Sequence, residues 1–112
     1  MNTVPLEQLS FASFASLVKT NFRVWIDGQD SLDLELSEIT PPRVSSTGGT
    51  NPLAYENFAL VFLGPADRLL PQRIYLFESA PLGRFELFIV PVSRDQNGTR
   101  YQATFNRLVK SN

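Results

Sequence analysis

The chain has 112 residues, of which 43% are hydrophobic and 19% charged, and its formal net charge is −1. Such a chain forms one globular domain, and its balanced charge provides no long-range field for nucleic acid or for an anionic membrane. Cysteine and histidine are both absent, which excludes thiolate and histidine metal sites, a cysteine nucleophile and the commonest general base. We therefore expect a non-enzymatic protein with no cofactor and no metal.

The N-terminal stretch MNTVPLEQLSFASF lacks a basic region followed by an apolar core and a small-residue cleavage site, so it does not resemble a signal peptide. No apolar run approaches the ~20 residues that cross a bilayer as a helix. From the sequence we expect no membrane association and a cytoplasmic location.

A short helix is predicted over about residues 11–19. Phe11, Phe14 and Val18 share one helical face, because side chains three or four residues apart lie together on a helix. Ser10 can cap the first turn, and Lys19 suits the negative end of the helix dipole. A helix of two turns needs other elements to pack against.

A β-hairpin follows, with strands at about residues 21–27 and 31–40 and a DGQD turn. Apolar residues alternate with polar ones in both strands, which predicts one buried and one solvated face. Ile39 is out of phase with Leu36, so a β-bulge is expected at Ser37 and Glu38. Residues 41–55 are rich in Pro, Ser, Thr and Gly at their start and centre, and a mobile loop is predicted there.

Three further strands are predicted at about residues 56–64, 72–78 and 84–92. The first is apolar on both faces, as is typical of a central strand. The third contains FELFIVPV, Phe85 to Val92, in which Pro91 cannot donate a backbone hydrogen bond and so ends the pairing.

The dipeptide Asn97-Gly98 predicts a type I′ turn to a last strand at about residues 99–108, since both residues tolerate positive φ. This turn would pair Val90 with Phe105, Val92 with Ala103, Leu87 with Leu108 and Ile89 with Asn106. The chain is thus predicted to be mainly β: a single domain, 1–112, with a six-stranded antiparallel meander that forms a small barrel or sandwich and one short N-terminal helix.

The carboxylates between Asp27 and Glu38 do not form a calcium loop, because Leu32 occupies the position where an EF-hand needs glycine. Asp33 and Glu35 share a strand face and could form an acid–base pair. Their alternation with leucine is more typical of a solvated face, so no catalytic residue is assigned.

The predicted interaction surface consists of Trp25, Phe85, Leu87 and Ile89. The phase of its strand places Trp25 on the polar side of the first hairpin, and exposed Trp is enriched in interfaces. The predicted register leaves one face of FELFIVPV uncovered, which predicts a protein partner or self-association.

The segments LLPQRIYLFESAPLGRFELFIVPV and TRYQATFN resemble a family of small uncharacterised bacterial domains, a domain of unknown function. LEQLSFASFASLVKTNFRV is similar to the family's opening, whereas Arg73 and Ser79 depart from a glycine and a histidine in its pattern. The resemblance implies no activity. It implies a genomic setting beside phage tail-collar-like and tail-fibre-like proteins, and with it incorporation in a phage-tail-like particle as an alternative location.

Two functions follow as hypotheses. The first is a structural or adaptor module that binds protein partners in a larger, phage-tail-like assembly. The second is a β-barrel that binds a small molecule or carbohydrate in a cavity lined by aromatic side chains.

Overall fold

The structure, a computed structural model, describes residues 3–46 and 53–110. The elements are η1 (Leu6–Gln8), α1 (Phe11–Ala15), β1 (Asn21–Trp25), β2 (Ser31–Ser46), β3 (Leu53–Gly64), β4 (Arg73–Ser79), β5 (Gly83–Asp95) and β6 (Gly98–Lys110). The predicted mainly-β class with a short helix near the N-terminus is confirmed. Within the described ranges no helix has the length and apolar character needed to cross a membrane.

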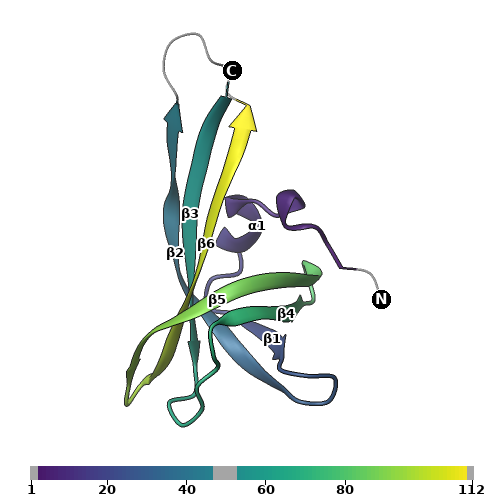
Figure 1. Cartoon of the computed structure of the whole chain (residues 1–112), viewed down its shortest axis with the longest axis vertical. Coiled ribbons are helices and arrows are strands. Elements are labelled where there is room, and N and C mark those ends of the chain that lie inside the picture. The colour runs from purple at the N-terminus through teal and green to yellow at the C-terminus, as the bar shows by residue number, and fades with distance from the viewer. Residues whose placement is uncertain (1–2, 47–52, 111–112) are drawn as a thin grey trace.

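The six strands close into an antiparallel barrel in the order β1-β2-β3-β6-β5-β4 (Figure 1). The barrel is confirmed, but its strands do not follow the sequential order of a meander. Each half of the chain forms a meander of three strands, and the halves join where β3 pairs with β6 and β1 with β4. The sequence predicts each hairpin from local signals, whereas the pairing between halves depends on how residues 65–72 are held.

Buried side chains hold this connection between β3 and β4. The hydroxyl of Tyr101 accepts a hydrogen bond from the backbone N–H of Leu70 at 2.9 Å, and Thr99 donates to the carbonyl of Pro65 at 3.1 Å. Tyr75 donates to the carbonyl of Pro71 at 2.6 Å, and burial raises the pKa of its phenol. These bonds satisfy backbone groups that an irregular segment would otherwise leave unpaired, and they fix β4 beside β1.

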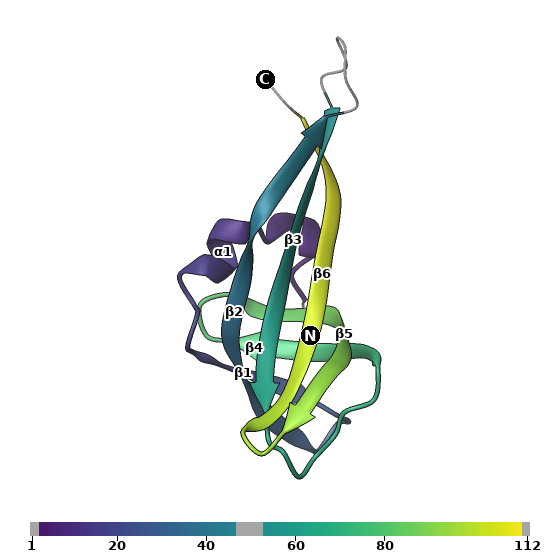
Figure 2. The same cartoon turned by 90° about the vertical axis from the view of Figure 1, so that its left-hand side faces the viewer.

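Strands β2, β3 and β6 extend past the barrel as a three-stranded arm (Figures 1 and 2). The loop predicted over residues 41–55 is therefore wrong at both ends, because β2 continues to Ser46 and β3 begins at Leu53. The register shifts between Thr40 and Arg43, at Pro41-Pro42. An irregularity of this kind tolerates prolines, which cannot donate to the ladder. Residues 47–52 lie outside the described residues.

The barrel interior is filled mainly by aromatic rings. Eight of the nine phenylalanines take part in ring contacts, with centroids between 4.6 and 6.4 Å apart: Phe11, Phe14, Phe22, Phe58, Phe62, Phe77, Phe85 and Phe105. Phe14 brings α1 onto the barrel and contacts Phe22, Phe85 and Phe105. The ninth, Phe88, makes no ring contact in the described part of the chain and is 46% exposed.

In the N-terminal half the predicted cap, hairpin and bulge are confirmed, but the helix is shorter than the predicted range 11–19. Ser10 caps α1 through a capping box with Ser13, although the α-helix ends at Ala15 and Lys19 has a φ of 76°. The β1–β2 hairpin pairs Phe22 with Leu34, and the bulge lies between Leu36 and Glu38.

The predicted register of the β5–β6 hairpin is wrong. The turn centres on Gln96 and Asn97 and pairs Asp95 with Gly98, and Asn97 is not among the residues with positive φ. Asp95 instead accepts a hydrogen bond from the backbone N–H of Asn97 at 2.8 Å. After a further shift near Val92, the pairs Val90–Phe105, Val92–Ala103, Leu87–Leu108 and Ile89–Asn106 are not formed; Val90 pairs with Gln102.

Candidate protein-binding face

The outer surface of β1, β4 and β5 carries a cluster of apolar side chains, which we call the docking face: Trp25, Ile74, Leu76 and Phe88. Cross-strand pairing places them together, because Trp25 pairs with Leu76 and Ile74 pairs with Phe88, and paired residues project to the same side of a sheet. Ile74 is 59% exposed. Clustered exposed apolar side chains on a small domain mark an interaction site more often than scattered ones do.

A row of alternating charges borders the docking face. The register sets Asp33 opposite Arg23, Arg23 opposite Glu78, and Glu78 opposite Arg84 across four adjacent strands. Asp33, one of the two carboxylates considered as an acid–base pair, therefore belongs to this row. Glu35 lies opposite Asn21 on the same outer side. The row has the character of a solvated sheet surface.

Glu78 links this row to Trp25. Its carboxylate accepts a hydrogen bond from the indole Nε1 of Trp25 at 3.2 Å and another from Nε of Arg84 at 3.3 Å. The Trp25 hydrogen bond, followed by that of Arg84, lowers the pKa of the Glu78 carboxyl below its ordinary value. Arg23 lies over the indole at 5.8 Å from its centroid. Glu78 and Arg23 thus both hold the half-buried indole ring, and Arg84 holds Glu78.

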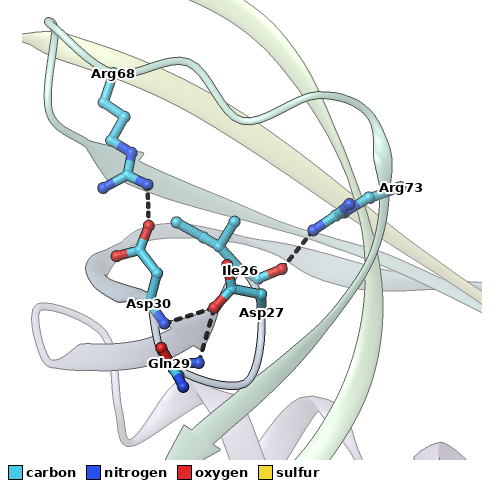
Figure 3. A network of polar contacts seen from close by, with 6 residues as sticks. All are labelled: Ile26, Asp27, Gln29, Asp30, Arg68 and Arg73. Carbon is cyan, nitrogen blue, oxygen red and sulfur yellow. Dashed lines mark hydrogen bonds and ion pairs between the residues drawn. The ribbon is translucent and has the colours of Figure 1, made fainter.

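The β1–β2 turn beside Trp25 is ordered by a polar network (Figure 3). The carboxylate of Asp27 accepts backbone hydrogen bonds from Gln29 and Asp30 at 2.8 and 2.7 Å, and these two bonds lower the pKa of Asp27. Arg68 forms an ion pair with Asp30, and Arg73 donates to the carbonyl of Ile26 at 2.7 Å. The turn is thereby tied to β4 and to the connection that precedes it.

A groove opens where the N-terminal segment, residues 3–6, passes the docking face. The backbone N–H of Val4 donates to the carbonyl of Arg84 at 2.7 Å, which fixes this segment beside β5. The groove has a volume of about 390 Å³ and is lined by Thr3, Val4, Pro5, Leu6, Ile74, Glu86 and Phe88. Its lining is apolar apart from the threonine and one carboxylate.

A smaller pocket of about 170 Å³ lies at the other side of the docking face. Its lining consists of Trp25, Asp27, Gly28, Leu76 and Arg84. One aromatic ring is thus accompanied by an anionic and a cationic side chain.

Three of the four residues predicted as an interaction surface lie inside the barrel. Phe85, Leu87 and Ile89 are buried, with exposures of 0, 3 and 0%, so that prediction is corrected. The predicted hairpin register paired Ile89 with a polar residue, so this side of β5 was expected to lie outside the barrel. In the structure the same side faces the interior. Only Trp25 belongs to the docking face.

The other members of the docking face were not predicted from the sequence: Ile74, Leu76 and Phe88. In RIYLFES the outward Ile74 and Leu76 alternate with the inward Tyr75 and Phe77, so both faces of this strand are apolar and the pattern alone does not show which is inside. One signal was available: Glu86 flanks Phe88 on β5, and a charged residue in an alternating strand marks the solvent side.

No group of three or more His, Cys, Asp and Glu residues that could hold a metal ion occurs in the part of the chain that the structure describes. The buried polar side chains in the same part all have hydrogen-bond partners. The residues that the geometry gathers on the surface are thus apolar side chains bordered by paired charges, an arrangement suited to binding.

Comparison with curated proteins and with solved structures finds no match to this chain. A family model does match, and it spans residues 9–105, which include β1 to β5, the first part of β6 and the whole docking face. The chain belongs to the family described as a domain of unknown function, DUF6916.

Proposed function

We propose that this domain is a non-enzymatic structural or adaptor module that binds a protein partner through the docking face. The observation that carries the proposal is the exposure of Ile74 and Phe88, at 59 and 46%, as a cross-strand pair on the outside of a barrel whose interior is already filled. Complete burial of a large apolar side chain gains roughly 1.5–3 kcal/mol, and about half of that gain remains to be made at each of these half-exposed residues. A partner that covers both recovers this free energy.

The paired charges around the face fit the same function. Interfaces commonly have an apolar centre and a polar rim, and here Glu78 and Arg84 lie in the row beside Trp25 and Leu76. A phage-tail-like assembly, which the family resemblance implies, is one setting in which such a module would act, and we retain it as part of the proposal.

The test is affinity purification from the native host with matched variants as bait. Phe88→Ser removes the centre of the docking face. Leu69→Ser is the control, because Leu69 is equally exposed, at 50%, but lies in the connection between β3 and β4. We expect the wild type and Leu69→Ser to retain the same partner and Phe88→Ser to lose it. Recovery of one identical set of proteins on all three baits would refute the proposal.

The pocket beside Trp25 supports a second candidate, the binding of a carbohydrate on the outer surface. An indole ring flanked by Asp27 and Arg84 offers an apolar platform with hydrogen-bonding groups beside it. The alternative of a ligand inside the barrel loses support, because aromatic side chains occupy the interior. Trp25 is the only tryptophan, so its fluorescence reports directly on sugars added in titration. A response that Asp27→Ala abolishes would favour this candidate, and an unchanged spectrum would count against it.

A further inference from the structure

The groove beside the docking face contains one acidic side chain whose charge is not balanced within the domain. Glu86 is exposed and lies between Arg84 and Phe88 on the outer side of β5. Its cross-strand neighbour is Leu76. Within residues 3–46 and 53–110 it forms no hydrogen bond and no ion pair. A carboxylate without a partner thus stands at the edge of an apolar groove.

The nearby arginines have other partners. Arg84, two residues away on the same face, points its guanidinium to Glu78 at 3.3 Å. Arg73 donates to the carbonyl of Ile26 and lies over the ring of Tyr75 at 4.6 Å. Neither is free to neutralise Glu86 without losing an interaction. The uncompensated negative charge therefore faces whatever enters the groove.

The groove also determines how an occupant can bind. The backbone of the N-terminal segment already bonds to β5 through Val4 and Arg84, so side chains rather than a bare strand edge form the available surface. Ile74 and Phe88 provide an apolar floor, and about 390 Å³ is within the range of pockets that hold ligand groups. The same site thus combines room for a large apolar side chain with a carboxylate beside it.

We infer that the groove binds a partner segment in which a large apolar residue is followed or preceded closely by lysine or arginine. The apolar side chain packs on Ile74 and Phe88, and the cation pairs with Glu86. This inference rests on the proposed function and names the chemistry of the partner at that face. It does not favour a second copy of this chain, because two docking faces meeting symmetrically would bring two Glu86 carboxylates into one interface.

The experiment is selection of a displayed library of random linear peptides against the immobilised domain. The baits are wild type, Glu86→Lys, Phe88→Ser and the control Leu69→Ser. We expect wild type and Leu69→Ser to enrich peptides with Lys or Arg within two positions of a large apolar residue. Glu86→Lys should enrich Asp or Glu at that position instead, and Phe88→Ser should enrich neither. Synthetic peptides from the wild-type selection should bind Glu86→Gln roughly two- to fivefold more weakly.

Two results would overturn the inference and leave the proposed function standing. One is enrichment that depends on Phe88 but shows no preference for a basic residue. The other is no enrichment on wild type above the Phe88→Ser bait, since a folded partner could still cover the face. The proposed function fails separately, if the host proteins recovered do not differ among its three baits.

Discussion

At the scale of single residues, Gly98 shows how one position fixes a hairpin. Its φ is 144°, and an added Cβ would lie 2.4 Å from the carbonyl oxygen of Gly64 and 2.7 Å from Leu63. We predict that Gly98→Ala lowers the free energy of unfolding by about 2 kcal/mol or more, because strain in φ adds to a backbone clash. Gly28→Ala is the control, since nothing lies within 4 Å of its Cβ position. Urea unfolding of both variants checks this, and equal midpoints would contradict it.

Glu78 gives a second prediction at this scale, because Trp25 reports on it. The lowered pKa of Glu78 means that its bonds to Trp25 and Arg84 stabilise the fold above pH 4.5, the ordinary pKa of a glutamate, and are lost as the pH falls through the lower folded value. We expect the fluorescence of Trp25 to change with a midpoint below pH 4.5 while the protein remains folded by circular dichroism. Glu78→Gln should remove this transition. A transition that persists in the variant would assign it to another group.

At the scale of elements, Phe14 is the buried anchor of α1 on the barrel, and Phe11 adds one ring contact with Phe58. Phe14 is fully buried and contacts three rings, so Phe14→Ala should lower the free energy of unfolding by about 3–5 kcal/mol. Phe88→Ala removes the same atoms from an exposed site and should cost much less. Chemical denaturation of the two variants makes the comparison. Similar losses would mean that Phe88 is part of the core, which would also remove it from the docking face.

The edge of the arm gives another element-scale prediction. Beyond Leu36, β2 pairs only with β3 among the described residues, and Pro41-Pro42 removes two backbone donors from it. Prolines at an edge oppose pairing with other chains. Replacing both with threonine should therefore raise the rate of aggregation, measured by light scattering at equal concentration. The double variant Ser45→Ala, Ser46→Ala in the same strand is the control. No difference between the two would show that the prolines do not protect this edge.

The same elements show how far the sequence could predict this fold. Alternation and capping predicted α1, the β1–β2 hairpin and its bulge, because each depends on residues close together in the chain. The pairing of β3 with β6 joins strands that are far apart in the chain, and the bonds from Tyr101 and Thr99 that hold residues 65–72 are likewise tertiary, so no local pattern contains either. At the candidate site, the phase of β1 placed Trp25 correctly. Asn97-Gly98 predicted a turn centred on those two residues, whereas the turn centres on Gln96 and Asn97. The predicted register therefore placed Phe88 inside the barrel and Ile89 outside, the reverse of their positions in the structure.

At the scale of the whole molecule, the interior position of Ile89 determines which variant can be used to test self-association. Ile89 is fully buried, so Ile89→Asp places a charge in the core and should unfold the domain rather than block an interface. The suitable variant is Phe88→Ser, which alters the docking face and leaves the core in place. Circular dichroism of both variants should show loss of the β signal in the first alone.

The docking face also leads to a prediction of the oligomeric state of the isolated domain. The apolar part of the docking face consists of four side chains, and a symmetric dimer through it would set Glu86 near its own copy, while the neighbouring Arg84 and Arg73 already have other partners. We therefore expect the isolated wild type to sediment as a monomer from low to high micromolar concentration, and Phe88→Ser to sediment in the same way. Addition of a peptide with an apolar and a basic residue should leave the wild type monomeric while it binds. Association of the wild type that rises with concentration, and that Phe88→Ser abolishes, would show that a second copy covers the docking face and would contradict a basic partner as its occupant.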